Sequence, residues 1–164
     1  MNILVTGGMG ILGSSLLNLL SKKYSKKNLF FLDRNKNKKR KLPLNINKFN
    51  SIHGNFNNYK EVFSIIKKNR INAIFHLGAI TQVIDAYKSP TETFNTNIQG
   101  TINICEAIRK INKEIIFIYS SSDKAYGSMS KKEYFENDRL QGNFPYDVSK
   151  SASDLHLDYN ATVG

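Results

Sequence analysis

Residues 2 to 14 read Asn2-Ile3-Leu4-Val5-Thr6-Gly7-Gly8-Met9-Gly10-Ile11-Leu12-Gly13-Ser14, and this stretch decides the fold that we expect. Ile3 to Val5 is a short continuous apolar run, which is typical of a strand buried on both faces. A glycine-rich turn follows, and from Ile11 the apolar residues recur at helical spacing. Strand, glycine turn and helix in this order predict the first βα unit of a parallel sheet that binds a dinucleotide.

The glycines are spaced Gly7-x-x-Gly10-x-x-Gly13, and each has an expected role. Gly7 allows the tight turn, Gly10 lets the backbone approach the pyrophosphate, and Gly13 lets the helix pack closely on the strand. The phosphates would face the free N–H groups at the start of the helix, where the helix dipole favours negative charge. The alternative is a tight βα turn without a ligand, because this spacing is not the more familiar G-x-G-x-x-G.

Asp33 ends the next apolar run, which begins at Asn28. A carboxylate about twenty residues after the glycines is expected to bind the ribose hydroxyls of the cofactor, which favours NAD over NADP. Arg34 follows directly and begins the basic run 34–41, so acceptance of a 2′-phosphate remains an alternative.

The chain has 164 residues, is 40% hydrophobic and carries a formal net charge of +11 at pH 7. This length predicts one domain with an ordinary core. No apolar run approaches the ~18 residues of a membrane span and no signal peptide is evident, so we expect a soluble, cytoplasmic protein. Cys105 is the single cysteine, and its apolar helical surroundings predict a buried thiol.

The positive charge admits two interpretations, solvated faces or nucleic-acid binding. It is densest in residues 34–41, and no aromatic residues interleave with that run to stack on bases. We therefore expect no nucleic-acid partner. The positive field would instead help to attract a phosphorylated, anionic substrate.

Strands alternate with helices along the rest of the chain. The predicted strands are 2–6, 28–33, 49–53, 73–77 and 115–120, and the predicted helices are 11–23, 58–69, 82–89, 90–111 and 144–161. This order predicts an α/β fold, a doubly wound parallel sheet (Rossmann fold) with strand order 3-2-1-4-5. Because no sixth strand follows the last helix, we expect residues 1–164 to form an incomplete dinucleotide-binding domain, truncated before the last strands.

A second group of candidate residues follows the fifth predicted strand. Ser120 to Lys124 would lie where an open parallel sheet places its ligand. Tyr146 and Lys150 are four residues apart, which sets them on one face of the last helix. A phenol of pKa ~10 is a poor base at neutral pH, but a neighbouring ammonium and a nicotinamide cation favour the phenolate. A solvated helix face is the alternative, and the position of the pair after the glycine motif favours catalysis.

The chain resembles the extended short-chain dehydrogenase/reductases, specifically the NAD-dependent sugar-nucleotide epimerases and dehydratases, over essentially its whole length. The resemblance rests on the glycine motif, Asp33 and the Tyr-x-x-x-Lys pair. It also rests on His76-Leu77-Gly78-Ala79, Asn97-Ile98-Gln99-Gly100-Thr101 and Ser120-Ser121-Ser122. Within the family, Ser122-Asp123-Lys124-Ala125-Tyr126-Gly127 looks most like the CDP-glucose 4,6-dehydratase group.

The resemblance implies a reaction. Tyr146, helped by Lys150, removes the proton from the sugar 4-hydroxyl while hydride passes from C4 to NAD, and Ser122 hydrogen-bonds the 4-oxygen. Water is then lost across C5 and C6, with Asp123 protonating the leaving hydroxyl and Lys124 assisting, and hydride returns to C6. A plain 4-epimerase needs no such acid, so the Asp-Lys pair separates the two chemistries unless it is a surface ion pair in a loop.

The resemblance also implies a cofactor-binding set and no metal. Beyond the three spaced glycines this set comprises Ile11, Leu12, Asp33, Arg34, Asn55, Leu77, Ala79, Asn97, Tyr146 and Lys150. Asn55 stands where the family usually has an aspartate that contacts the adenine, so it would act through an amide. His76 is expected to be structural rather than a base.

Two further expectations concern a longer parent protein. Family members bind the nucleotide sugar with a C-terminal portion that we expect to be absent here, so a cofactor-binding fragment without turnover is another alternative. Family members also often dimerise through helices that correspond to residues 90–111 and 144–161, so the full-length protein is expected to be a homodimer.

Overall fold

The computed structural model describes residues 1–34, 48–111, 114–128 and 133–163, with the side chains of 159–163 left out. It divides into two compact units. The first, here called the sheet unit, comprises Met1–Gly78 and Glu106–Ser120. The second, the helical unit, comprises Ala79–Cys105 and Ser121–Gly164. Residues 35–41 of the basic run lie outside the described residues.

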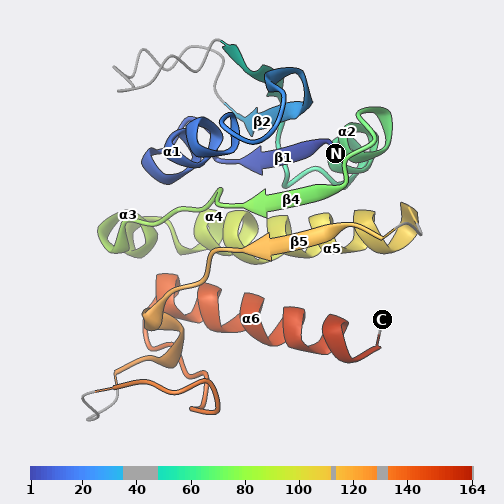
Figure 1. Cartoon of the computed structure of the whole chain (residues 1–164). Helices are drawn as coiled ribbons and strands as arrows, with labels where there is room; N and C mark the ends of the chain where they lie inside the picture. The colour runs from blue at the N-terminus through green and yellow to red at the C-terminus, as the bar shows by residue number, and fades with distance from the viewer. Residues whose placement is uncertain (35–47, 112–113, 129–132, 164) are drawn as a thin grey trace. The chain divides into compact units, whose positions relative to one another are not determined.

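The sheet unit contains a five-stranded parallel sheet in the order β3-β2-β1-β4-β5 (Figure 1). The predicted strand order is therefore confirmed. Each observed strand lies inside its predicted range; the strands are β1 (Ile3–Thr6), β2 (Leu29–Asp33), β3 (Asn50–His53), β4 (Ala73–His76) and β5 (Ile116–Tyr119). β1 is the central strand and pairs with β2 and β4, as the predicted strand order requires.

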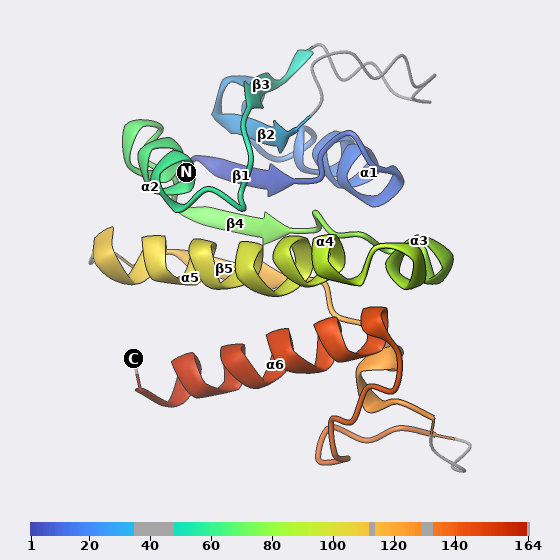
Figure 2. The same cartoon turned by 180° about the vertical axis from the view of Figure 1, so that it is seen from behind.

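Two α-helices of the sheet unit lie on opposite faces of the sheet, α1 (Ile11–Leu20) and α2 (Tyr59–Lys68) (Figures 1 and 2). The short 3-10 helix η1 (Lys26–Asn28) leads into β2. α1 ends three residues before its predicted end, because the Lys22 and Lys23 N–H groups bond to carbonyls three residues back and tighten the last turn.

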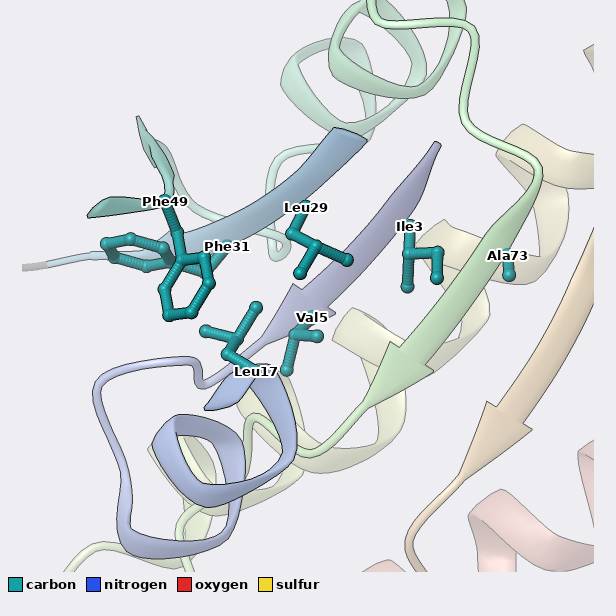
Figure 3. Packing of buried hydrophobic residues seen from close by; sticks show 7 residues of the cluster. All are labelled: Ile3, Val5, Leu17, Leu29, Phe31, Phe49 and Ala73. Carbon is teal, nitrogen blue, oxygen red and sulfur yellow. The ribbon is translucent and has the colours of Figure 1, made fainter. Parts of the chain in front are cut away.

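The core of the sheet unit forms between α1 and the strands that it covers. Ile3 and Val5 of β1, with side chains on one face, pack with residues of the neighbouring elements, namely Leu17, Leu29, Phe31, Phe49 and Ala73 (Figure 3). Leu4 of β1 points to the other face and is also buried, at 3% exposed. Burial of both faces positions the β1 carboxyl end, and hence the glycine turn, rigidly.

The helical unit begins with α3 (Val83–Lys88) and α4 (Pro90–Phe94). A π-helical segment, η3 (Asn95–Gln99), then joins α4 to α5 (Gly100–Ile111) without a break. The predicted helix 90–111 is confirmed in extent, but the sequence periodicity gave no sign of the π-helical turn. α5 spans both units, and Cys105 on it is half-buried, so the prediction of a buried thiol is wrong.

The helical unit ends with the 3-10 helix η4 (Asp123–Tyr126) and α6 (Pro145–Val163). η4 lies between β5 and α6, in a part of the chain for which no helix was predicted. α6 packs against α3, α4, η3 and η4. No helix in the described part of the chain is both long enough and apolar enough to cross a membrane.

Candidate functional site

The glycine turn that follows β1 has the conformation that the sequence predicted. Gly7 adopts a left-handed φ of +66°, and its N–H donates to the Leu32 carbonyl at 3.1 Å. The Gly10 N–H donates back to the Gly7 carbonyl at 2.8 Å, which closes the turn. Gly10 is the N-cap of α1 and supplies no side-chain cap, and the first turn of α1 contains no acidic residue. These features suit an anion at the start of α1.

Gly13 is required by close packing, although its partner differs from the predicted one. A Cβ on Gly13 would lie 2.3 Å from the Gly7 carbonyl oxygen and 2.7 Å from the Gly8 Cα. The helix therefore packs against the turn itself rather than against the strand. Gly8, to which the sequence assigned no role, is held over Phe31, whose Cβ would lie 2.3 Å from a Gly8 Cβ.

Two residues of the predicted cofactor set begin α1 and are exposed to solvent. Ile11 is 81% exposed and Leu12 is 66% exposed, although both are apolar. Since α1 buries its other face, these side chains stand beside the turn and can contact a ligand bound there.

The carboxyl ends of β2 and β3 border a pocket of about 610 Å³. Its lining includes Arg34 and Asn55 of the predicted cofactor set, and Lys60 and Glu61 from α2. Asp33 ends β2 and its carbonyl accepts a hydrogen bond from the Gly54 N–H at 3.2 Å. The adenosine-binding residues that the sequence predicted are therefore grouped at one edge of the sheet.

Asn55 is held by its own loop. Its N–H donates to Glu61 Oε2 at 2.8 Å, and its side-chain oxygen accepts from the Asn57 N–H at 3.0 Å. Within the described residues its side-chain NH₂ group makes no hydrogen bond. Asn55 therefore offers a ligand an amide donor, where an aspartate would offer acceptors.

His76 at the end of β4 has a structural environment, as expected. It is 2% exposed, and its Nδ1 lies 2.6 Å from the hydroxyl of Thr6 on β1. The same hydroxyl accepts a hydrogen bond from the Gly78 N–H at 3.0 Å. These hydrogen bonds join the carboxyl ends of β1 and β4. Leu77, between His76 and Gly78 in the sequence, packs against the core of the sheet unit.

Asn97 in the helical unit uses its whole side-chain amide within the protein. Its oxygen accepts from the Ile80 N–H at 2.8 Å, and its NH₂ group donates to the Ile80 carbonyl at 3.0 Å and to Ser149 Oγ at 2.9 Å. The sequence placed Asn97 in the cofactor-binding set. In the structure its side chain holds the segment that follows Ala79, and both of its N–H donors are used within the protein.

Tyr146 and Lys150 lie one turn apart near the start of α6. Both are buried, at 8% and 3% exposed. Burial lowers the pKa of Lys150 to about 8, and the Asp154 carboxylate opposes this shift. The Tyr146 hydroxyl makes no hydrogen bond to the described residues, which leaves it available to a ligand. A solvated helix face, the alternative interpretation, does not fit this burial.

Ser122 caps the short helix that carries the predicted acid. Its Oγ accepts from the Lys124 N–H at 3.2 Å and donates to Asp123 Oδ1 at 3.1 Å. Asp123 and Lys124 are both exposed. In this part of the described chain the two form no ion pair, and they lie on η4 rather than in a loop.

Two residues of the helical unit, Ser149 and Asp154, had no predicted role, and Ser121 had none beyond its place in the serine run. Ser149 is fully buried and its hydroxyl donates to the Tyr146 carbonyl at 2.6 Å. Ser121 donates to Asp154 Oδ2 at 2.5 Å. The four-residue spacing of Lys150 and Asp154 was the signal that could have identified the carboxylate.

The predicted residues are thus divided between the units. The sheet unit holds the glycine turn with Ile11 and Leu12, then Asp33, Arg34, Asn55 and Leu77. The helical unit holds Ala79, Asn97, Ser122, Asp123, Lys124, Tyr146 and Lys150. All five residues with predicted catalytic roles therefore lie in one unit. Ser122 caps η4, which carries Asp123 and Lys124, and η4 packs against α6, which carries Tyr146 and Lys150. No group of three or more potential metal-binding side chains occurs among the described residues.

Comparisons with known proteins extend over nearly the whole chain. Residues 4–162 match the family model described as GDP-mannose 4,6 dehydratase. CDP-paratose 2-epimerase of Salmonella typhi is 29% identical, and the match covers 100% of this chain and 54% of that protein. CDP-glucose 4,6-dehydratase of Salmonella typhimurium is 27% identical over 62% of this chain and 29% of that protein. UDP-glucose 4-epimerases are also among the matching proteins.

Solved structures share the fold. The dTDP-glucose 4,6-dehydratase DesIV of Streptomyces venezuelae, solved with NAD bound, is 25% identical with a TM-score of 0.85 and covers 99% of this chain. This chain covers 52% of that structure, and it spans about half the length of the relatives that it matches over its full extent. On the family match and the shared architecture, the chain belongs to the GDP-mannose 4,6 dehydratase family, among the sugar-nucleotide epimerases and dehydratases of the extended short-chain dehydrogenase/reductases.

Proposed function

We propose that this chain is the NAD-binding portion of a sugar-nucleotide 4,6-dehydratase of the CDP-glucose type. The observation that carries the proposal is the exposed carboxylate of Asp123, which begins η4 and accepts a hydrogen bond from Ser122. η4 packs against α6, the helix that bears Tyr146 and Lys150. A dehydratase needs an acid in addition to the tyrosine base, and the position of Asp123 beside the Tyr146 helix supports this role.

The residues of the sheet unit fit NAD. The turn at Gly7 and Gly10 and the uncapped start of α1 would bind the pyrophosphate, since a Cβ on Gly10 would meet only the Gly7 oxygen, at 3.1 Å. Asp33 would bind the adenosine ribose, and Arg34 and Asn55 would line the adenine pocket. Ile11, Leu12 and Leu77 would contact the rest of the cofactor, and Ala79 is the contact that we propose from the helical unit. NAD, when bound, supplies the acceptor and later the donor of hydride.

The residues of the helical unit would move protons. Tyr146 takes the proton of the sugar 4-hydroxyl as hydride leaves C4, and the Lys150 ammonium stabilises the phenolate. Lys150 is mostly protonated at neutral pH, because its pKa is about 8. Ser122 turns its hydroxyl from Asp123 to the 4-oxygen of the sugar. Lys124, in its amine form, would then take the proton from C5 while Asp123 protonates the hydroxyl that leaves C6, so that water is lost across C5 and C6.

A second candidate function is sugar-nucleotide 4-epimerisation, which the UDP-glucose 4-epimerases among the relatives favour. It uses the same tyrosine and lysine but needs no acid at Asp123. A third is a cofactor-binding fragment without turnover, which the coverage of about half of each relative favours. For a longer parent protein we propose a nucleotide-sugar substrate, a cytoplasmic location and a homodimer formed through α5 and α6.

Calorimetric titration with NAD and NADP tests the cofactor part of the proposal. We expect saturable binding of NAD, weaker binding of NADP, and loss of NAD affinity in Asp33→Ala. Asp85→Ala, which removes an exposed carboxylate on α3, is the matched control and should bind like the wild type. Equal binding by wild type and Asp33→Ala would refute the ribose assignment.

An assay with CDP-glucose and NAD tests the dehydratase part. The expected product is a 4-keto-6-deoxy sugar, identified by mass, and Asp123→Asn should abolish water loss while Asp85→Asn has no effect. An epimerised sugar of unchanged mass, formed equally by Asp123→Asn, would favour the epimerase. NAD binding without any conversion would favour the fragment.

A further inference from the structure

Asp154 forms a polar link between α6 and the chain that leads into η4. Ser121, the residue directly before Ser122, donates its hydroxyl to Asp154 Oδ2 at 2.5 Å. The two residues are 33 positions apart in sequence and both belong to the helical unit. A bond to an ionised carboxylate is stronger than one between neutral groups. It therefore restrains the segment that presents Ser122 and Asp123.

Asp154 also lies one helical turn beyond Lys150, on the same face of α6. Lys150 is 3% exposed, so its ammonium is removed from water and gains from a nearby negative charge. Asp154 itself is half-buried and is oriented by the Ser121 hydroxyl. One carboxylate thus serves both the proposed lysine and the segment of the proposed acid.

We propose that Asp154 is a positioning residue that fixes the Ser122 segment against α6 through Ser121 and holds Lys150 in its ammonium form. This inference rests on the proposed function, since it assigns a task to the partner of the proposed catalytic residues. Asp154 touches neither substrate nor cofactor in this scheme and acts through its two neighbours.

The other charged groups near this pair come from the elements packed against α6. The titratable groups on these elements are Asp123, Lys124 and Tyr126 on η4, Glu92 on α4, and Asp85, Tyr87 and Lys88 on α3, and α6 itself carries Tyr146, Asp147, His156 and Asp158. Among the described residues, Asp154 is the one whose charge acts on the pKa of Lys150, and it raises it. Burial raises the pKa of Asp154, and the negative charge of Asp158 adds a smaller shift in the same direction. The hydrogen bond from Ser121 and the charge of Lys150 lower it.

The test is a titration of the lysine side chains by NMR with ¹³C label at Cε, in the chain as it stands and without NAD. Lys150 is assigned by the signal that disappears in Lys150→Arg. In Asp154→Asn the charge is lost while an oxygen remains for Ser121, so the Lys150 pKa should fall from about 8 by about one unit. Should this variant fail to fold, Asp154→Ser replaces it, with the same expectation.

The second arm separates the hydrogen bond from the charge. Ser121→Ala removes the bond and keeps the carboxylate, so amide exchange at Lys124 and Ala125 should quicken several-fold while the Lys150 pKa stays near 8. Asp85→Asn, which removes an exposed carboxylate on α3, is the control and should leave both readouts unchanged.

Two results would overturn the proposal. One is that the Lys150 pKa in Asp154→Asn equals the Lys150 pKa in the wild type. The other is unaltered amide exchange in Ser121→Ala. Neither readout requires cofactor or turnover, so a failure of the proposed function, seen as absence of NAD binding by calorimetry, is measured independently.

Discussion

The ring of Phe56 fills the space that a side chain at Gly78 would need. A Cβ on Gly78 would lie 2.7 Å from Phe56 Cε1, closer than such atoms approach, and 3.1 Å from the Thr6 hydroxyl. Phe56 is 5% exposed and packs edge-on against His76, with ring centroids 5.2 Å apart. The ring of Phe56 therefore leaves no room for a side chain at position 78.

Gly78→Ala should therefore destabilise the protein. The added methyl must displace a buried ring, and overpacking of this kind costs about 1–3 kcal/mol. Urea unfolding measures the loss. Phe56→Leu alone should also destabilise, by loss of packing, but the double variant should be more stable than the sum of the two effects predicts. Strict additivity would show that Phe56 does not limit the residue at position 78.

Asn97→Ala should lower the free energy of unfolding by on the order of 3 kcal/mol. The substitution removes the side-chain partner of the N–H and carbonyl of Ile80, which are partly buried, and one of the two hydrogen bonds of the buried Ser149 hydroxyl. Asn95→Ala, on the same π-helical segment but exposed, should change it by less than about 0.5 kcal/mol. Equal effects of the two changes in urea unfolding would argue against the role of Asn97 as a clamp.

Lys150→Met should change how stability depends on pH. Burial lowers the folded-state pKa of Lys150 to about 8 from 10.5, so between these values the unfolded chain binds the proton and the folded chain does not. The unfolding free energy contributed by Lys150 therefore rises with pH across this window, by up to about 3 kcal/mol. Urea unfolding at several pH values should show this rise in the wild type and not in Lys150→Met. Parallel curves for the two proteins would contradict the burial of the ammonium.

Gly13→Ala and Gly10→Ala should separate folding from cofactor binding. A Cβ on Gly13 would meet backbone atoms at 2.3 and 2.7 Å, so this variant should lose both stability and NAD affinity. A Cβ on Gly10 would meet only the Gly7 oxygen, at 3.1 Å, so it should cost about 1 kcal/mol or less in unfolding. It should nevertheless weaken NAD binding at least about tenfold, because the methyl occupies the side from which the phosphates approach. Unchanged NAD affinity in Gly10→Ala, measured by calorimetry, would show that the pyrophosphate does not bind at this turn.

The sequence by itself determined the order of the strands and the form of the glycine turn. Both follow from local properties: apolar runs of four or five residues, helical periodicity, and the need for glycine at the left-handed Gly7. The face shared by Tyr146 and Lys150 was also readable, because four residues make about one helical turn. Helix ends were less predictable, as the early end of α1 illustrates.

Only the tertiary structure decided how these residues are supported. Asn97 was predicted to belong to the cofactor site, and only the structure shows that its side chain bonds to Ile80 and to Ser149, 52 residues away. Ser121 and Asp154 are 33 residues apart, and the contact of Phe56 with Gly78 joins a loop to a strand end. Such pairs leave no periodic trace in a single sequence, because they depend on which side chains the folded backbone brings within hydrogen-bond or van der Waals distance. The sequence therefore specified which elements form, and their packing specified the environment of each functional side chain.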